Sequence, residues 1–317
     1  MTNVFVNHWS YALGDEAYTV EEAAAMGRIR SSAAALKEAG FARHRVCRPH
    51  TTAYDLARRA VEKIRGRLGD VGAIVYATCI PCNANIGEEK KFRETGDVKH
   101  LMDFPAGHLQ RDFGLERATA IGINQQACTG MLGSLRLART LLIAEPEIRR
   151  VLCVTADRFP AGASYEQSYN LISEGAAACV VSAEPTGFQL IAWHGIANGS
   201  LAMASDDEVI GSYFTYTHRL IGEALAKAGL QMNDIRWIVP QNINVKAWRI
   251  ISRLLEFSFE QVYFPTLGEV GHVISADNII NLKRLVEEGK IQPGERALLV
   301  MAGYGLNWQC VILERRS

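Results

Sequence analysis

Cys128 is the residue of this chain best placed to act as a nucleophile. An apolar, strand-like stretch (118–123) leads to a turn of small residues that contains Cys128, and a segment with the pattern of a helix (131–144) follows directly. A thiol at a helix N-terminus lies next to unpaired backbone N–H groups and the positive end of the helix dipole, which lower its pKa and favour the thiolate. Taken alone, this segment is equally compatible with a buried structural cysteine.

The elements around Cys128 alternate between strands and amphipathic helices, which is typical of an α/β protein with helices covering a mixed sheet. We expect buried strands at 73–77, 118–123, 151–155, 177–181, 188–193, 237–240, 296–301 and 308–313. We expect helices at 51–67, 106–113, 130–144, 213–228, 245–257 and 277–288.

The two halves of the chain, 1–185 and 186–317, look like two copies of one unit. Each contains a buried strand, a short turn and a long helix, and no Pro/Gly/Ser-rich linker separates them. We therefore predict a fused, duplicated core rather than two tethered domains. Segment 82–108 is polar and rich in Lys and Glu, which fits either a lid near the site or a surface insertion.

The composition excludes several classes of protein. The 317 residues are 48% hydrophobic and 21% charged, with a formal net charge of zero, so nothing suggests binding to nucleic acid or to an anionic membrane. No signal peptide or membrane-spanning run is recognisable. The seven cysteines are scattered and fit reduced thiols of a cytoplasmic protein. Cys79 and Cys82 form a C-x-x-C pair without a second pair for zinc, and we interpret them as loop cysteines.

Five motifs follow one another along the chain. They are Ala127-Cys-Thr-Gly130, Ser173-Glu-Gly-Ala-Ala-Ala-Cys179, Pro240-Gln-Asn-Ile-Asn244, Gly271-His-Val-Ile-Ser-Ala-Asp277 and Gly303-Tyr-Gly-Leu-Asn-Trp308. Their order resembles the thiolase superfamily, most closely the β-ketoacyl-acyl carrier protein synthase III branch, from about Lys37 to Cys310. Each motif is weakly specific alone, whereas five in the family's order are a strong signal.

The resemblance implies a five-layered αβαβα fold, a homodimer or a heterodimer with a paralogue, and acyl transfer through a thioester on Cys128. It also places an oxyanion hole at the backbone N–H groups of Cys128 and Tyr304, where donors must be in position before the tetrahedral intermediate forms. Gly303 and Gly305 on either side of Tyr304 would let that backbone come close, although a tight turn alone would also explain them.

The chain departs from the condensing members at two catalytic positions. Gln241 replaces the family's His, and His272 replaces the family's Asn. The second partner of Cys128 thus becomes an imidazole, which can accept a proton from an alcohol or amine, as in the similar ketosynthase-like acyltransferases of natural-product pathways. Asp277, or one of Gln241, Asn242 and Asn244, could orient the ring.

Two other functions remain open. The imidazole and the carboxamide have only exchanged positions, so the pair could still stabilise an enolate in a decarboxylative carbon–carbon condensation with a malonyl donor. Alternatively, the chain could be a non-catalytic partner of an active paralogue. Against this last function, both Cys128 and an imidazole are retained.

The resemblance also bears on donor and substrate. Coenzyme A-dependent members place a Trp and an Arg where this chain has Ala34 and Glu38, which favours an acyl carrier protein or a differently bound coenzyme A. No cofactor beyond the donor's phosphopantetheine is implied. Phe104 falls where the family lends a residue to the neighbour's acyl pocket, unless it simply precedes a helix starting at Pro105. His218 lies on the helix expected to line the acyl tunnel.

Overall fold

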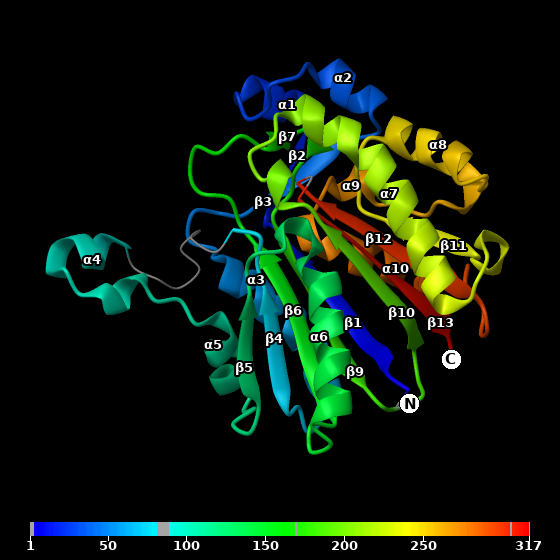
Figure 1. Ribbon diagram of the computed structural model, residues 1–317. Coiled ribbons are helices and arrows are strands. Elements are labelled where there is room, and N and C mark those ends of the chain that lie inside the picture. The colour runs from blue at the N-terminus through cyan, green and yellow to red at the C-terminus, as the bar shows by residue number, and fades with distance from the viewer. Residues whose placement is uncertain (1–2, 81–88, 169, 305, 317) are drawn as a thin grey trace.

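The computed structural model describes residues 3–80, 89–168, 170–304 and 306–316. Its largest feature is a nine-stranded mixed sheet (Figure 1). In the order in which they lie side by side, the strands are β11 (Trp237–Pro240), β12 (Arg296–Gly303), β13 (Asn307–Arg315), β10 (Phe188–Ala197), β1 (Phe5–Leu13), β9 (Gly175–Ser182), β6 (Arg150–Asp157), β4 (Ala73–Ala77) and β5 (Thr119–Ile123).

Six longer helices pack against this sheet. They are α3 (Ala53–Glu62), α5 (Pro105–Asp112), α6 (Gly130–Ala144), α7 (Asp206–Ala228), α8 (Val245–Leu254) and α10 (Asp277–Glu287). Smaller elements complete the described residues: α1 (Val20–Ala25), α2 (Ala33–Glu38), α4 (Glu89–Thr95), α9 (Leu267–Val270), and the paired strands β2 (Glu16–Thr19) with β3 (Arg43–Val46) and β7 (Glu166–Gln167) with β8 (Asn170–Leu171).

The sheet has two parts that meet at a short junction between β1 and β10. Only two residue pairs join these strands, Phe5 with Gln189 and Val6 with Phe188. On one side of the junction, β4 pairs in parallel with both β5 and β6, and on the other side β11 pairs in parallel with β12. Parallel strands place their carboxyl ends at the same edge, so each part offers one edge at which loops can assemble a site.

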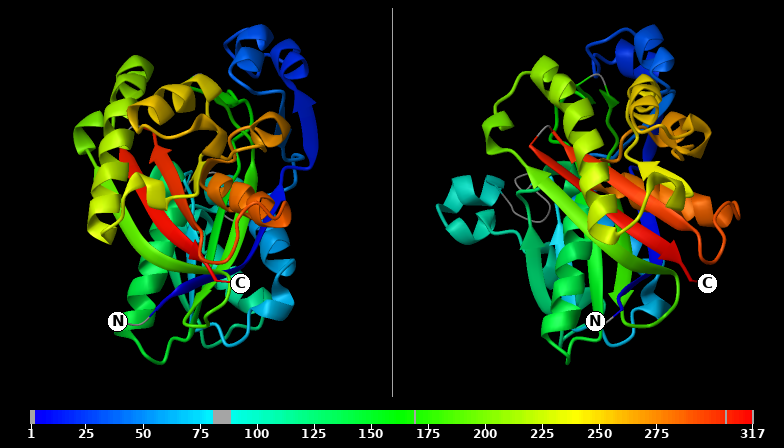
Figure 2. Two further views of the ribbon diagram at one scale, coloured as in Figure 1. Left: turned by 90° about the vertical axis from the view of Figure 1, so that its right-hand side faces the viewer. Right: turned by 45° about the vertical axis from the view of Figure 1, so that its right-hand side comes forward.

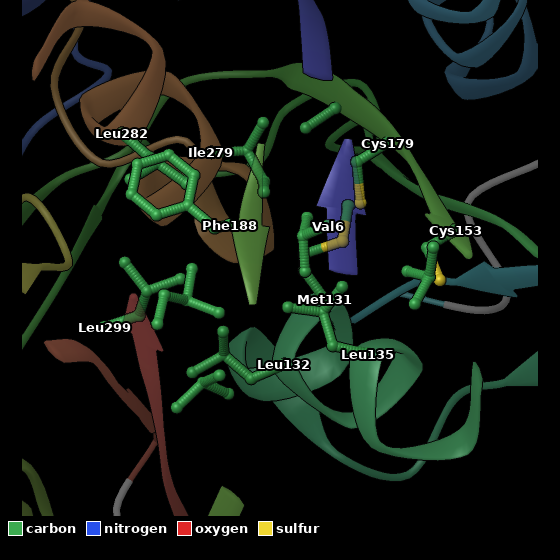
Figure 3. Close-up of a cluster of buried hydrophobic side chains, with 14 of the residues drawn as sticks. Val6, Met131, Leu132, Leu135, Cys153, Cys179, Phe188, Ile279, Leu282 and Leu299 are labelled. Carbon is green, nitrogen blue, oxygen red and sulfur yellow. The ribbon is translucent and has the colours of Figure 1, made fainter. Parts of the chain in front are cut away.

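Three hydrophobic clusters show that the molecule has five layers. The central cluster combines α6 and α10 with strands from both parts of the sheet, and Figure 3 shows its side chains meeting. The contributing side chains include Met131, Leu132 and Leu135 from α6, Ile279 and Leu282 from α10, and Val6, Phe188 and Leu299 from the sheet. A second cluster packs α3 and α5 on one outer face, and a third packs α7 and α8 on the other (Figure 2). The predicted αβαβα arrangement is confirmed.

Two strands differ from what the sequence predicts. Strand β5 was expected to be buried, yet its five residues are exposed or half-buried because it lies at the edge of the sheet and pairs with β4 alone. Strand β1 was not expected at all, although it joins the two parts. Its pattern is interrupted by a bulge between Asn7 and Ser10, where His8 has a φ of 49°.

The polar segment that begins with α4 projects from the molecule. Helix α4 lies well away from the sheet at the left of Figure 1, and the chain returns through α5 to the edge strand β5. The apolar side chains of Val98, Leu101, Met102 and Phe104 are exposed along this return. Among the described residues, no helix is both long and apolar enough to cross a membrane.

Candidate active site

Cys128 lies in the middle of a single 3-10 turn (Ala127–Thr129) that runs directly into α6. The turn is held by the backbone carbonyl of Gln126, which accepts hydrogen bonds from the N–H of Thr129 (3.0 Å) and from its hydroxyl (2.7 Å). Ala127 has a φ of 44°, a left-handed conformation that non-glycine residues rarely adopt and that is characteristic of functional turns. The half-buried Cys128 is therefore placed at the helix N-terminus as the sequence predicts.

The closing loop of the chain packs against the backbone of Cys128. A Cβ atom at Gly303 would lie 2.9 Å from the carbonyl oxygen of Gln126 and 3.2 Å from the nitrogen of Cys128, so only glycine fits there. Tyr304, the next residue, has a φ of 45°. The backbone of this loop is thus brought beside that of Cys128, where the oxyanion hole was expected. Gly305 lies outside the described residues.

His272 and Asp277 form the second half of the site. The ring Nδ1 of His272 lies 2.5 Å from Oδ2 of Asp277, and both side chains are buried. Asp277 is the first residue of α10, and its carboxylate also accepts hydrogen bonds from the backbone N–H groups of Val273 and Asn242, each at 2.7 Å. An aspartate at a helix N-terminus with three such contacts is a fixed anion. Of the four candidates for orienting the ring, Asp277 makes this contact.

The backbone of His272 is fixed independently of its side chain. Its N–H donates to the carbonyl of Leu171 and its carbonyl accepts from the N–H of Ser173, both at 2.8 Å. The carboxamide of the buried Asn242 donates to the carbonyl of Gly271, the residue before His272, at 2.8 Å. Asn242 therefore has a structural role that its place in the motif did not distinguish from a catalytic one.

Cys128 and His272 shift each other's pKa, through a hydrogen bond between their side chains and through their opposite charges. A hydrogen bond from Cys79, opposed by burial and aided by the contact with His272, lowers the pKa of Cys128 to about 5. Burial alone would lower the pKa of His272, but the charge and hydrogen bond of Asp277, together with Cys128, raise it to about 10. Because Nδ1 faces Asp277, the other ring nitrogen, Nε2, faces the thiolate. At neutral pH the site holds a thiolate, an imidazolium and a carboxylate in a row.

Cys79, which the sequence led us to treat as a loop cysteine, belongs to this site. Its thiol is hydrogen-bonded to Cys128, which raises the pKa of Cys79 and keeps it protonated. The buried Asp157 holds this loop, because Oδ1 accepts from the N–H groups of Cys79 (2.7 Å) and Ile80 (3.1 Å) and from the hydroxyl of Thr78 (2.8 Å). Burial, against these hydrogen bonds, raises the pKa of Asp157 to about 7. Cys82 lies outside the described residues.

The reactive groups open into a largely apolar cavity of about 240 Å³. Its lining includes Cys128, His272, Gln241, Asn244 and Tyr304, together with apolar side chains of α7 and α8. Gln241 is held by its Oε1, which accepts from the N–H of Ala302, so its Nε2 is the atom left to act as a donor. Asn244 caps α8 by accepting from the N–H of Lys246 at 3.0 Å, and it forms part of the wall of the cavity.

Phe104 and His218 lie outside the lining of this cavity. Phe104 is 62% exposed, immediately precedes α5 and lines a separate hollow beside β5. His218 is exposed on α7 and is not among the residues that line the catalytic cavity. Among the described residues, no group of three or more His, Cys, Asp or Glu side chains is arranged to hold a metal ion.

Comparisons with known proteins show the family of this chain. A model of the 3-oxoacyl-[acyl-carrier-protein] synthase III family matches residues 123–199, and a model of the C-terminal part of the same family matches residues 225–315, together more than half of the chain. The beta-ketoacyl-[acyl-carrier-protein] synthase III of Chlamydia caviae is 26% identical over 309 residues, covering 87% of this chain and 86% of that protein. The enzyme of the same name from Aquifex aeolicus is 23% identical over 291 residues, covering 87% and 88%.

Solved structures show the same fold. The acyltransferase ChlB3 superposes with a TM-score of 0.82 at 20% identity over 99% of this chain and 98% of its own. The synthase III of Thermus thermophilus gives 0.82 at 23% identity over 98% of both chains, and OleA of Xanthomonas campestris gives 0.80 at 15% over 99% and 98%. With motifs, layers and family models in agreement, this chain belongs to the 3-oxoacyl-[acyl-carrier-protein] synthase III family of thiolase-fold enzymes.

Proposed function

We propose that the protein is an acyltransferase that carries an acyl group as a thioester on Cys128 and passes it to a hydroxyl or an amine, with His272 as general base. The observation that carries this proposal is the line of contacts from Asp277 through His272 to Cys128. Transfer to oxygen or nitrogen needs a base that removes a proton from the acceptor, and an imidazole held by a carboxylate provides one. We infer a setting in natural-product assembly, because primary fatty-acid synthesis uses the usual His/Asn pair.

In the first half-reaction, the Cys128 thiolate attacks the carbonyl carbon of the donor thioester. The oxyanion that forms is stabilised by the backbone N–H groups of Cys128 and Tyr304, whose chains meet at Gly303. When the intermediate collapses, the carbon–sulfur bond to the donor breaks. The imidazolium of His272 then gives its Nε2 proton to the departing thiolate, so the products are a free thiol, an acylated Cys128 and a neutral ring.

In the second half-reaction, the neutral ring of His272 acts as the base. Acylation removes the negative charge of Cys128, which is one of the groups that raise the pKa of His272, and the pKa of the ring therefore falls. The ring takes the proton of the acceptor as its oxygen or nitrogen attacks the thioester. Collapse of this intermediate releases the ester or amide and restores the thiolate–imidazolium pair, so protons balance over the cycle.

We propose an acyl carrier protein as donor, with its phosphopantetheine arm entering the cavity. At the cavity mouth, Lys246 is paired with Glu38 of α2 at 2.6 Å, so a carboxylate faces the place where coenzyme A would bring its nucleotide phosphates. The exposed face of α8 carries the cations Arg249 and Arg253 next to the apolar Ile250 and Leu254. An acidic protein surface would complement this face over a larger area than a nucleotide would.

We further propose that the protein is a dimer formed through β5. Thr119 donates to Gly72 and Ile123 accepts from Thr78, both towards β4, so the alternate residues Ala120 and Gly122 point their backbone groups outward. An exposed strand with unpaired N–H and C=O groups is a template for a second strand. A second copy of the chain or a paralogue would satisfy these groups and cover Phe104 nearby.

Decarboxylative condensation is the second candidate function. The observation that favours it is the place of Gln241, which lines the cavity together with Cys128 and His272 and whose Oε1 accepts from Ala302, so that Nε2 is its donor atom. Together with the imidazolium, this amide could donate two hydrogen bonds to an enolate. Condensation, however, does not require a carboxylate that makes His272 a proton acceptor. Transfer to a hydroxyl or an amine does require one.

Intact-protein mass spectrometry with a panel of acyl and malonyl donors, on carrier protein and on coenzyme A, tests the proposal. We expect an acyl adduct on the wild type and on the thiol control Cys47→Ser, and none on Cys128→Ala. Discharge of the adduct by alcohols or amines, without any malonyl donor, supports the acyltransferase. Discharge only with a malonyl donor and release of CO₂ would establish condensation instead, and no adduct with any donor would indicate a non-catalytic partner.

A further inference from the structure

Two thiols meet at the site, although they are 49 positions apart in the sequence. Cys79 follows the end of β4 by two residues and Cys128 follows β5, and because these strands are parallel, both chains leave the sheet at the same edge. A Cβ at Gly130 would lie 2.9 Å from that of Ala77, so the start of α6 sits directly on the end of β4. Both thiol side chains pack against one small cluster of buried residues, namely Val46, Phe159, Tyr165, Ile172 and Ile274.

We propose that Cys79 is a positioning residue, whose thiol donates a hydrogen bond to the sulfur of Cys128 and holds that sulfur as a thiolate facing His272. The inference rests on the proposed function only in so far as Cys128 is the nucleophile. Sulfur is a weak donor, but a donor to a charged acceptor contributes more than one to a neutral acceptor. The hydrogen bond therefore favours the reactive form of Cys128 over the thiol.

The position of Cys79 is set by rigid contacts. The N–H of Thr78 donates to the carbonyl of Ile123 at 3.0 Å, which ties the loop after β4 to the end of β5. One oxygen of Asp157, at the end of β6, then accepts from Thr78, Cys79 and Ile80, as described above. Three neighbouring strands thus aim the Cys79 side chain, and the loop needs no contact with substrate to do so.

The charges around Cys128 explain why such a donor is needed. Burial and the carboxylate of Asp277 disfavour a negative charge on Cys128, and the imidazolium of His272 is the cation that opposes them. Cys79 adds a donor without adding charge. Its own pKa is raised by the contact, so it stays a thiol while Cys128 is ionised. A serine could replace this donor, whereas a valine of similar size could not.

The test measures how fast iodoacetamide alkylates Cys128 as a function of pH, followed at the Cys128 peptide by mass spectrometry. For the wild type we expect a midpoint at about pH 5. In Cys79→Val the midpoint should rise by about one to two pH units, so that alkylation at pH 5 slows about five- to fiftyfold. Cys79→Ser should keep most of the low midpoint, and Cys47→Ser, which removes a thiol that packs in a different cluster, should leave it unchanged.

The outcomes separate positioning from packing. Equal shifts in Cys79→Val and Cys79→Ser, or no shift in either, would overturn the inference, and thermal unfolding of each variant shows that the protein is folded. The readout needs no acyl donor. If the wild type is never acylated, but Cys79→Val raises the alkylation midpoint and Cys79→Ser does not, the proposed function is refuted and the inference is supported. A wild type that is acylated on Cys128, but whose alkylation midpoint does not depend on residue 79, supports the proposed function and refutes the inference.

Discussion

The two central helices, α6 and α10, begin in comparable ways and carry complementary charges. The chain reaches α6 after an edge strand and presents Cys128 as a thiolate, and it reaches α10 after the bridge of Val262 to β11 and presents Asp277 as a carboxylate. Neither helix has a hydrogen bond from an N-cap side chain. Each N-terminus therefore faces an anion, which its dipole stabilises, and the imidazolium of His272 lies between the two.

The edges that precede these helices differ. Beside β4 stands a five-residue strand with exposed backbone groups, whereas beside β11 the equivalent place is taken by a single parallel bridge at Val262. Val262 and Phe264 are buried in the outer cluster that includes α8. The edge at β5 can thus pair with another strand, whereas the edge at β11 is covered by side chains of the same chain. This difference is the reason why we propose an intermolecular contact for the part that carries Cys128 and not for the part that carries His272.

Replacing the anion of α10 tests the comparison most severely. We expect Asp277→Asn to lower the pKa of His272, raise that of Cys128 and reduce acyl transfer by about 10²- to 10⁴-fold, because the imidazolium loses its fixed counter-charge. The surface variant Asp97→Asn is the control. Alkylation of Cys128 should shift to higher pH in the first variant alone. Unchanged alkylation in Asp277→Asn would show that the two helix termini act independently.

Gly303→Ala tests the close contact between the loop at Gly303 and the turn that carries Cys128. The added Cβ would push against the backbone of Gln126 and Cys128, so the two N–H groups of the proposed oxyanion hole would separate. We expect kcat/KM to fall by about 10- to 100-fold, with alkylation of Cys128 nearly unaffected. Gly222→Ala on α7, where nothing lies within 4 Å, should leave activity unchanged. Equal losses of alkylation and turnover would mean that the turn itself had moved.

The pH dependence of acylation measures the charge pair directly. The first half-reaction requires an ionised Cys128, present above about pH 5, and a protonated His272, present below about pH 10. The kcat/KM for the donor should therefore rise through about pH 5, stay level, and fall about tenfold per pH unit above about pH 10. A rising limb near pH 8 to 9 would instead indicate an ordinary thiol that becomes ionised only during catalysis.

The sequence predicted elements best where a regular pattern is buried along its whole length. Helix α6 begins and ends at Gly130 and Ala144 because it packs against the central cluster, and strands β4 and β11 keep their expected bounds because both of their faces are buried. Strand β1 was missed because its central place depends on pairing with β9 and β10, which are distant in the sequence. Strand β5 was placed correctly, but its burial was not, since Ala, Ile and Gly occur in edge strands and buried strands alike.

The sequence predicted some residues of the site and missed others. Three residues were predicted from the family motifs. Cys128 and His272 line one cavity, and Gly303 packs against the backbone beside Cys128. The role of Cys79 could not be predicted, because the contact depends on two parallel strands ending at one edge and not on sequence spacing. The division into residues 1–185 and 186–317 as a duplication stays a prediction, although the matching starts of α6 and α10 are what it would lead one to expect.

Ala120→Pro separates the open edge from the closed one. Proline removes the outward N–H of Ala120 and leaves the hydrogen bonds of Thr119 and Ile121 with β4, so the fold should persist while pairing with a second chain weakens. We expect a shift from dimer to monomer in sedimentation or light scattering, with only a several-fold loss of turnover. Ala120→Thr keeps the N–H and is the control. A protein that is monomeric before any substitution would contradict the proposed use of β5.

Glu38→Gln should have the smallest effect, because Glu38 and Lys246 are both exposed and their pairing contributes little to stability. The ion pair lowers the pKa of Glu38, so the carboxylate is charged at neutral pH and partly neutralises Lys246. Releasing Lys246 adds a cation to the α8 face beside the cavity, and we expect KM for an acidic acyl carrier protein to fall about two- to fivefold at low salt, with kcat unchanged. Coenzyme A donors should gain as well, since a carboxylate no longer faces their phosphates. A gain with coenzyme A and none with the carrier protein would place the nucleotide, and not a protein, at this mouth, and would leave the comparison between the two helix starts untouched.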